Sequence, residues 1–395
     1  MLDTLERLPA DSILGLSAAC RADPNPDKVD LTVGIYMDEQ GNCPVFEAVR
    51  EAQRALVAEE TTKAYMPPEG DDAFNLGMQR LVLGGDSGAL RDGRVSSIQT
   101  PGGCGALHIG AEIIHSAVPA ARVWVSDPTW PVHLPLLGSV GLRFENYRYY
   151  EAGSHGVNFE GMVADLGAAT RGDVVLLHGC CHNPCGADLS LDQWDVIADM
   201  AERQGFTPFV DIAYQGLGDG LAEDAAGLRL LADRLPEVIL AASCSKNMGL
   251  YRERTGTAMF VCRDRDNAGA ILSQALVAAR RIYSMPPAHG ALLAGRILSD
   301  GRLDALWRSE LGTMCGRING LRTALREKLE GASGLDFGFI EREKGMFSFL
   351  GLTPEQTARL REEHSVYMLG SSRINVAGVN ARNIDYLAEA VATVL

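Results

Sequence analysis

Short apolar runs alternate with amphipathic stretches through the middle of the chain. The runs at 122–126, 173–178, 209–211 and 238–242 consist mostly of apolar residues. Such runs are typical of strands that are buried on both faces of a sheet. The stretch 191–200 has apolar residues at helical spacing, as expected for a helix between two strands. The alternation predicts an α/β fold in which helices cover a mostly parallel central sheet.

The pattern changes from about residue 302 onward. A long charged segment at 317–330 predicts a helix, and shorter apolar runs follow around 346–349 and 373–376. These elements indicate a second, smaller α+β domain. A chain of 395 residues is also too long for one ordinary domain.

The chain is acidic, with a net charge of −15 and a pI near 5.0. An acidic surface repels phosphate backbones and anionic lipid, so we expect neither nucleic acid nor a membrane as a partner. No apolar stretch approaches the roughly 18 residues that a membrane span needs. The nine cysteines form no regular framework and no secretory leader is evident, which favours reduced thiols in the cytoplasm.

Lys246 follows the apolar run 238–242, in the string Ser243-Cys244-Ser245-Lys246-Asn247. Desolvation at the end of a buried strand lowers the pKa of a lysine toward the range in which a free amine attacks a carbonyl. The flanking hydroxyls suit a phosphate. Together they suggest an imine-forming lysine beside pyridoxal 5'-phosphate (PLP). A lone lysine at a strand end is more often a surface charge.

Two further features suit the same cofactor. Gly102 and Gly103 open a helical pattern after a strand-like segment, where backbone N–H groups can approach a phosphate, although glycine turns without ligands are common. Asp211 ends another strand, and a buried carboxylate needs a cationic partner such as a pyridinium nitrogen. A helix-capping role for Asp211 is the alternative. Tyr214, three residues on, can face the same cleft.

The segment 180–185 contains three thiols and an imidazole, which is a full tetrahedral set for zinc. We reject a zinc site, because the four groups are crowded into six residues and adjacent cysteines point apart. No second ligand pair lies at a suitable spacing. We expect instead a turn after the strand that ends at His178, with Asn183 facing the cleft and no metal.

Three arginines stand in settings that suit anions. Arg254 follows Lys246 closely, Arg280 precedes a turn at 283–287, and Arg373 interrupts a run of small and apolar residues. Guanidinium groups match carboxylates and phosphates with two parallel hydrogen bonds. For any one of these arginines, a surface charge is the simpler interpretation.

These motifs, in this order, resemble the class I aminotransferases of PLP fold type I, in particular the branch that acts on aspartate and aromatic amino acids. The matching strings cover nearly the whole chain and include Thr100-Pro101-Gly102-Gly103, Asp127-Pro128-Thr129-Trp130, Cys180-Cys181-His182-Asn183-Pro184, Asp211-Ile212-Ala213-Tyr214-Gln215-Gly216, Ser245-Lys246-Asn247, Pro286-Pro287-Ala288-His289-Gly290 and Arg373-Ile374-Asn375-Val376-Ala377-Gly378. The resemblance implies a large PLP-binding domain over 45–310. It also implies a small domain, built from 1–44 and 311–395, that closes on the substrate.

The resemblance also implies a role for each motif. Lys246 would be the Schiff-base lysine and proton shuttle, Asp211 would pair with the pyridine nitrogen, and Tyr214 would hydrogen-bond the phenolic oxygen of the ring. The implied cofactor-binding set also contains Gly102, Gly103, Cys104, Trp130, Asn183, Ser243, Ser245, Arg254 and, from a partner subunit, Tyr65. The implied substrate-binding set is Gly34, Trp130, Asn183, Arg373, Asn375 and, from a partner subunit, Arg280. Arg373 would hold the α-carboxylate and Arg280 a distal carboxylate, in a cytoplasmic homodimer whose two chains share each site.

Several positions depart from the aspartate-type pattern. Cys104 and Cys185 stand where those members carry threonine. Soft or apolar residues also replace polar ones on the expected substrate side, namely Met37, Cys43, Ala64 and Met285. Such replacements lower the cost of burying an aromatic ring. We therefore predict an aminotransferase that moves amino groups from aromatic amino acids, and also from aspartate, to 2-oxoglutarate in a ping-pong cycle of PLP and pyridoxamine phosphate.

Three alternatives remain open. The nearest is a strict aspartate aminotransferase, which steady-state kinetics would distinguish. A second is another PLP reaction on this fold, such as β-elimination or decarboxylation, which needs no acceptor oxo acid. A third is a non-catalytic protein that retains the fold. The intact set of Lys246, Asp211 and Arg373 disfavours the third.

Overall fold

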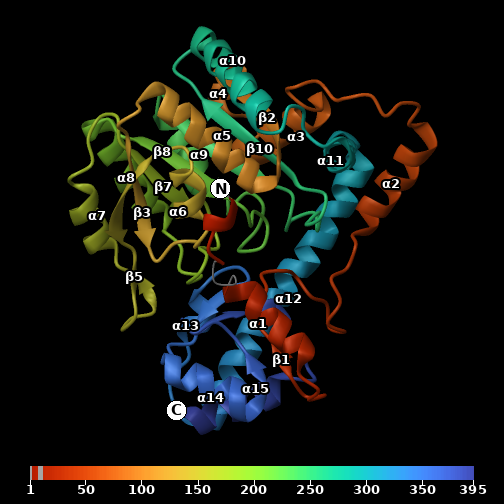
Figure 1. Ribbon diagram of the computed structural model, residues 1–395, viewed down its shortest axis with the longest axis vertical. Helices are drawn as coiled ribbons and strands as arrows, with labels where there is room; N and C mark the ends of the chain where they lie inside the picture. The colour runs from red at the N-terminus through yellow and green to blue at the C-terminus, as the bar shows by residue number, and fades with distance from the viewer. Residues whose placement is uncertain (1, 8–11) are drawn as a thin grey trace.

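The computed structural model describes residues 2–7 and 12–395 (Figure 1). Its centre is a seven-stranded sheet. In spatial order the strands are β2 (Val95–Pro101), β10 (Thr255–Val261), β9 (Val238–Ser243), β8 (Thr207–Ile212), β7 (Val174–His178), β3 (Arg122–Asp127) and β4 (Arg143–Arg148). The four apolar runs predicted as strands lie in β3, β7, β8 and β9.

Strands β9, β8, β7, β3 and β4 pair in parallel, which confirms the mostly parallel sheet. Strand β10 is the exception, because it runs antiparallel to both of its neighbours, β2 and β9. The sequence analysis did not predict β10 as a strand. The antiparallel direction brings its first residue, Thr255, beside Pro101 at the end of β2.

Helices cover both faces of this sheet, and each face has its own hydrophobic cluster. On one face, Ile109 of α5 and Ala275 of α10 share a cluster with Phe209 of the sheet. On the other face, Met78 of α3 and Trp194 of α8 share a cluster with Leu177. The helices of this part are α2 (Glu47–Glu59), α3 (Asp72–Leu83), α4 (Gly88–Arg91), α5 (Gly102–Ala117), α6 (His133–Gly138), α7 (Phe159–Leu166), α8 (Leu191–Gln204), α9 (Ala226–Arg234), α10 (Arg265–Ile282) and α11 (Ala288–Ser299). A small hairpin, β5 (Tyr150–Glu151) and β6 (Gly156–Val157), lies at the side.

The N-terminal segment joins the C-terminal part, which has a third hydrophobic cluster. Strand β1 pairs in parallel with β12, with Val29 opposite Val366. This part contains α1 (Ser12–Ala22), β1 (Val29–Asp30), α13 (Phe339–Arg342), β11 (Phe347–Phe349), α14 (Pro354–His364), β12 (Val366–Tyr367), β13 (Arg373–Asn375), η2 (Val376–Gly378) and α15 (Ile384–Val394), and η1 (Leu2–Thr4), which has no buried residue, precedes it in the chain. The third cluster therefore combines residues from near both ends of the chain, such as Val29 and Val394.

A single long helix, α12 (Gly301–Ser333), connects the two parts (Figure 1). It contains the predicted helix at 317–330 and begins 16 residues earlier, after Asp300 caps it by accepting from the Leu303 amide. The helix passes without interruption through the position that separates the two expected domains, between residues 310 and 311. Side chains of α12 can therefore reach from one part to the other.

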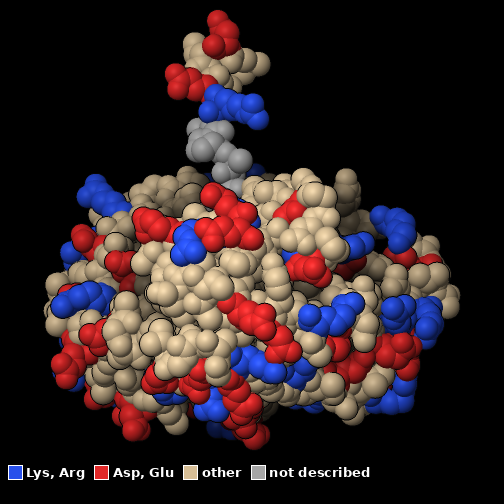
Figure 2. All heavy atoms as spheres, turned by 90° about the horizontal axis from the view of Figure 1, so that it is seen from below, with Lys and Arg blue, Asp and Glu red and all other residues tan. Residues whose placement is uncertain are grey.

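None of the helices described is long and apolar enough to span a membrane. On the face seen in Figure 2, acidic side chains are scattered among basic ones. Strands β2, β3, β7, β8 and β9 end at the same edge of the sheet, since each runs in the same direction. Ligands in α/β folds bind beyond this carboxyl edge, so the fold points to it as the place to examine.

Candidate active site

A cavity of about 290 Å³ lies at the carboxyl edge of the central sheet. It collects side chains from the ends of β7, β8 and β9, from the start of α5 and from β13 of the C-terminal part. The residues that both line it and belong to the expected site are Gly34, Gly103, Cys104, Trp130, Asn183, Asp211, Tyr214, Ser243, Ser245, Lys246, Arg254 and Arg373. The fold thus brings together residues that are 339 positions apart at the extremes, Gly34 and Arg373.

Lys246 lies in the turn after β9, and its Nζ is 4.8 Å from the centre of the Tyr214 ring. Burial lowers the pKa of Lys246, although the nearby Asp211 and Cys104 act in the opposite direction. Within residues 2–7 and 12–395, no hydrogen bond or ion pair engages this amine. An amine whose pKa is lowered, and which none of these described residues engages, can react with an aldehyde bound in the cavity.

Three polar or aromatic side chains surround the lysine. Tyr214 is buried, and burial raises the pKa of its phenol. Asn183 is also buried and faces the same cavity. Trp130 lines the cavity and meets the ring of His133 edge-on, with 5.3 Å between the ring centres. The space beside Lys246 is therefore bounded by aromatic faces with hydrogen-bonding groups at the margin, which suits a flat heteroaromatic ring.

Asp211 begins a chain of hydrogen bonds that runs away from the cavity. Its Oδ2 lies 3.0 Å from Nε2 of His133, the Nδ1 of His133 lies 2.8 Å from the Thr129 hydroxyl, and that hydroxyl lies 3.2 Å from Nε2 of His178. Burial by itself raises the pKa of Asp211, but the interactions with His133, His178 and Lys246 together outweigh burial, so the pKa of Asp211 is lowered overall. Burial and the neighbouring His133 lower the pKa of His178 to about 3. Asp211 is therefore anionic at neutral pH and His178 is neutral.

Thr129, His133 and His178 were not among the expected site residues. Thr129 lies before α6, His133 is the first residue of that helix, and the 2.8 Å contact between their side chains brings them together. His178 was noted only as the end of a strand. Polar side chains at the carboxyl ends of neighbouring strands were the available signal, since β7 and β8 pair His178 directly with Asp211.

The start of α5 forms a cradle for an anion. The helix has no side-chain cap, so the N–H groups of its first turn point toward the cavity edge. Gly102 has φ +70°, and a Cβ there would lie 2.6 Å from Nη2 of Arg254. A Cβ on Gly256 would collide with the backbone of Gly102. The hydroxyls of Ser243 and Ser245 complete the cradle. A helix N-terminus, a guanidinium and two hydroxyls together fit a phosphate group.

Arg373 stands on β13 and is only 2% exposed. Its Nη2 donates to the Thr32 carbonyl at 2.6 Å and its Nη1 to Oδ1 of Asn183 at 3.4 Å. The Nε–H is buried and has no acceptor among the residues described. Burial lowers the pKa of this arginine. A desolvated guanidinium with spare donors, at the wall of a cavity, suits a carboxylate.

Asn375 does not line the cavity, although it was expected to bind substrate. Its Nδ2 donates to the carbonyls of Val33 and Ile35, at 2.7 and 2.8 Å. These bonds hold the segment around Gly34, where a Cβ would lie 2.6 Å from the Phe347 ring. In this chain Asn375 therefore acts on the cavity wall through Gly34.

Tyr65 and Arg280 lie outside the cavity of their own chain. Tyr65 is 89% exposed, and the exposed Arg280 donates to the Ser284 hydroxyl at 2.6 Å. The residues expected to shape an aromatic subsite also do not line this cavity, namely Met37, Cys43, Ala64 and Met285. The cavity of a single chain therefore contains the residues expected to bind PLP and the α-carboxylate. It does not contain the side chains that are expected to determine substrate choice.

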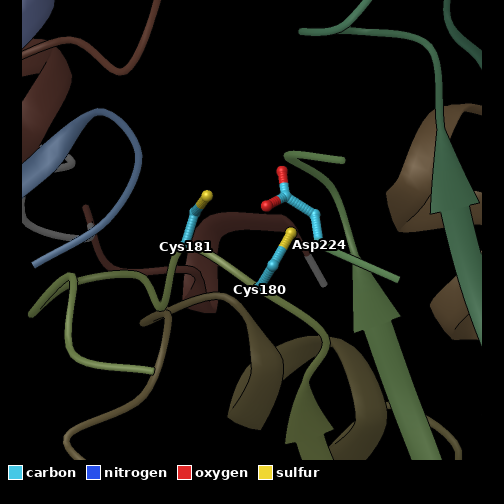
Figure 3. A group of neighbouring side chains, drawn as sticks. All are labelled: Cys180, Cys181 and Asp224. Atoms are coloured by element: carbon cyan, nitrogen blue, oxygen red, sulfur yellow. The ribbon is translucent and has the colours of Figure 1, made fainter. Parts of the chain in front are cut away.

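The cysteine-rich turn does not gather the zinc ligands that were considered. The ring nitrogens of His182 face the thiol of Cys185 at 3.2 Å and the hydroxyl of Ser126 at 3.1 Å. Cys180, Cys181 and Asp224 instead form a buried group whose ligand atoms lie within 4.8 Å of one another (Figure 3). The Asp224 carboxylate already accepts three backbone N–H groups, from Gly216, Gly218 and Asp219. These bonds give Asp224 a role in holding the turn after β8.

Comparison with known proteins agrees with this geometry. The family model described as aminotransferase class I and II matches residues 26–391. The chain is 48% identical to an aromatic-amino-acid aminotransferase of Paracoccus denitrificans, over 99% of both chains. It is 45% identical to an aspartate aminotransferase of Salmonella typhi, over the full length of both. Among solved structures, an aromatic-amino-acid aminotransferase from Burkholderia pseudomallei, covalently bound to pyridoxal phosphate, is 42% identical with a TM-score of 0.98, covering 100% of this chain and 99% of that one.

Proposed function

The chain belongs to the class I and II aminotransferases and uses pyridoxal 5'-phosphate, and from this premise we propose that it transfers the amino group of aromatic amino acids, and of aspartate, to 2-oxoglutarate in a ping-pong cycle. One observation carries the proposal. The half-buried amine of Lys246, for which residues 2–7 and 12–395 offer no hydrogen-bond or ion-pair partner, shares a cavity with the anionic Asp211 and with the spare donors of Arg373.

The residues around the cavity fit the cofactor part by part. Lys246 would attach to its aldehyde, and the cradle at Gly102, Arg254 and Ser243 would hold its phosphate. Asp211 would hold a proton on the pyridine nitrogen, since the carboxylate is kept ionised by His133. When bound, PLP supplies an electron-poor ring that accepts the electron pair left at the substrate Cα.

Lys246 would also move the proton. Burial lowers the pKa of the amine, which makes its neutral form more accessible than that of an exposed lysine. A neutral Nζ can take a proton from the substrate Cα and deliver it elsewhere in the same cavity, as a general base and then a general acid. Tyr214 lies against the amine, with its ring centre 4.8 Å from Nζ, and limits where the amine can swing.

Arg373 would orient the substrate through its α-carboxylate. Its fork is fixed by Thr32 and Asn183 before any substrate arrives, so little freedom is lost on binding. An α-carboxylate paired with this fork would hold the Cα–H bond toward the side of the cavity that carries Lys246. Orientation of this kind accounts for a large part of the catalytic advantage of a bound substrate.

The substrate class rests on the relatives and on the residues that differ. Relatives with both aromatic and aspartate names match along the whole chain, at 48% and 45% identity. Met37 and Met285 would offer soft surfaces to a ring, and Arg280 would pair with a distal carboxylate. A strict aspartate aminotransferase is the second candidate, favoured by the retention of Arg280.

The positions of Tyr65 and Arg280 support the homodimer that we propose. Both are exposed and lie outside the cavity of their own chain, so a second copy would have to deliver them if they serve a site. The nine free cysteines agree with the cytoplasmic location that we propose.

The test is a half-reaction screen. Purified holoenzyme is mixed with one amino acid at a time, and cofactor absorbance is followed before and after adding 2-oxoglutarate. We expect phenylalanine, tyrosine and aspartate each to shift the absorbance and 2-oxoglutarate to restore it. A kcat/KM for phenylalanine more than about a hundredfold below that for aspartate would exclude the aromatic substrates and favour the strict aspartate aminotransferase. Release of ammonia or carbon dioxide without an acceptor would indicate a different PLP reaction.

A further inference from the structure

Helix α12 carries a buried arginine, Arg322, that has no place in the reaction as described so far. Arg322 is 1% exposed, and its guanidinium donates four hydrogen bonds to three backbone carbonyls in the segment 340–347. Its Nη1 donates to the Ile340 carbonyl at 2.8 Å, and its Nη2 donates to the carbonyls of Gly345 and Phe347 at 2.7 and 2.6 Å. The Nε donates to Gly345 at 3.2 Å. Burying a guanidinium carries a large desolvation free energy, which is more than holding a turn by itself would require.

The segment held by Arg322 leads directly to the proposed carboxylate site. Phe347 opens β11, which pairs antiparallel with β13, so that Phe347 lies opposite Asn375 and Phe349 lies opposite Arg373. The Phe347 ring lies 4.5 Å from Cζ of Arg373, and it meets the Tyr214 ring edge-on at 5.8 Å. On a third side it fills the space at Gly34. One side chain therefore contacts the guanidinium, the phenol and the loop that bound the substrate side.

The turn has no room to shift. Gly345 has φ +73°, and a Cβ there would collide with Cys181. A Cβ on Gly186 would lie 2.5 Å from the Phe347 carbonyl, and the Lys344 amide donates to the Gly186 carbonyl at 2.7 Å. The turn is therefore pressed against the loop 181–186, which carries Asn183, the second partner of Arg373. Any displacement of the Phe347 carbonyl would therefore disturb Arg373 in two ways, through the Phe347 ring and through Asn183 on the adjoining loop.

We propose that Arg322 is a positioning residue for substrate carboxylates. By binding the carbonyls of Gly345 and Phe347, it fixes the Phe347 ring against Arg373 and so sets the direction of the Arg373 fork. The inference rests on the proposed role of Arg373 in holding the α-carboxylate. Glu343 is the acidic side chain that contacts the same guanidinium, with 3.5 Å between its Oε2 and Nη1 of Arg322.

The experiment compares Arg322→Lys with a matched control, Arg326→Met. Lysine keeps the charge but has a single point of attachment, so it cannot span the carbonyls of residues 340, 345 and 347. We expect KM for phenylalanine and for 2-oxoglutarate to rise by about tenfold each, with kcat within about threefold of wild type. Arg326 lies four residues along α12 and pairs with Glu341 at 3.2 Å, outside the turn. We expect its KM values to stay within about twofold.

A second readout reports carboxylate binding without turnover. The dissociation constant of 3-phenylpropionate, which has a carboxylate but no amine, is measured from the cofactor absorbance. It should rise in Arg322→Lys by about the same tenfold factor as KM. A purely structural role would instead lower the melting temperature and the fraction of active enzyme while leaving KM and this constant unchanged, and that result would overturn the proposal.

Phe347→Leu covers the case in which Arg322→Lys does not fold. It keeps the bonds of Arg322 to the backbone and removes the ring beside Arg373, so KM should rise for both substrates. An unchanged KM in Phe347→Leu would refute the inference. The proposed function fails separately, if the wild-type cofactor absorbance does not respond to phenylalanine or aspartate at all.

Discussion

At the scale of single residues, the electrostatic partner of Asp211 matters most. Its carboxylate is mostly buried, and burial alone would raise its pKa and favour the neutral form. The hydrogen bond of 3.0 Å with His133 is the largest of the interactions that oppose burial, His178 and Lys246 add to it, and Thr129 contacts the other nitrogen of the His133 ring. His133 therefore helps to keep Asp211 anionic, which is the form that the proposed pairing with the pyridine nitrogen needs.

We predict that His133→Asn lowers kcat/KM by roughly 10- to 100-fold, the usual effect of removing a supporting partner of a site residue. Without the His133 hydrogen bond the pKa of Asp211 rises, so the acidic limb of the kcat/KM profile should move to higher pH. The measurement is a pH profile of kcat/KM with aspartate. His108→Asn, at a half-buried position on α5 paired with Glu112 at 3.7 Å, is the control. An unshifted acidic limb in His133→Asn would rule out this role.

At the scale of elements, the meeting of β10, β2 and α5 builds the anion cradle. β10 runs antiparallel to β2, so Gly256 lies opposite Thr100 and packs against the backbone of Gly102. This close approach is what lets the free N–H groups of α5 and the guanidinium of Arg254 converge on one point. Glycine is required at both positions by sterics, at Gly102 also by its φ of +70°.

We predict that Gly256→Ala weakens PLP binding by at least about tenfold, because the new methyl group would displace Gly102 and with it the first turn of α5. The measurement is a titration of apoenzyme with PLP followed by absorbance. Gly103→Ala is the comparison, since a Cβ there lies 3.6 Å from the Ser243 hydroxyl, an ordinary contact, and its loss of affinity should be smaller. Equal losses in both variants would count against the steric explanation.

The turn that follows α13 carries a second consequence for stability. Glu343 is buried, and burial raises its pKa from 4.5 to about 8 although Arg322 lowers it. Ser348 donates to Glu343, and Tyr150 and Cys185 are close enough to interact with it. The folded pKa lies above the unfolded value. The stability contributed by the neutral carboxyl is therefore complete below about pH 4.5 and is lost as the pH rises toward 8.

We predict that Glu343→Gln, which is neutral at every pH, gains stability over wild type as the pH rises through this window. The gain between about pH 5 and pH 8 should be at least ~1 kcal/mol, measured by urea unfolding at each pH. The control is Glu341→Gln. Glu341 lies on α13 and pairs with Arg326 of α12, so this variant removes a nearby acidic side chain outside the buried turn. A gain that shrinks with rising pH would contradict the assignment.

At the scale of the whole molecule, the fold leaves two of the expected site residues, Tyr65 and Arg280, outside the cavity. The long helix α12 ties the C-terminal part to the sheet, and Arg373 reaches the cavity from that part. Tyr65 and Arg280 instead face outward. If two chains share each site, an inactive chain can be complemented by a different inactive chain.

We predict that mixing Lys246→Ala with Arg280→Ala, by unfolding and refolding them together, restores about a quarter of wild-type activity on aspartate. Half of the randomly formed dimers are hybrids, and one of the two sites in each hybrid then holds both native residues. Neither variant alone should exceed a few per cent on aspartate, while Arg280→Ala should retain activity on phenylalanine. No recovery in the mixture would exclude a site shared in this way.

The sequence determined the class of fold and the chemistry of the site. Buried strands are apolar because of their own residues, and the glycine turn, the strand-end Asp211 and Lys246 carry their chemistry locally, so all could be predicted. Strand β10, the Thr129–His133–His178 chain and the Arg322 turn could not. Each depends on which distant segments become neighbours. That choice is set by the free energy of packing the whole chain and is not a property of any local pattern. Only the tertiary structure decided that Asn375 binds the backbone on both sides of Gly34, and that Arg322 on α12 binds the turn that carries the Phe347 ring beside Arg373.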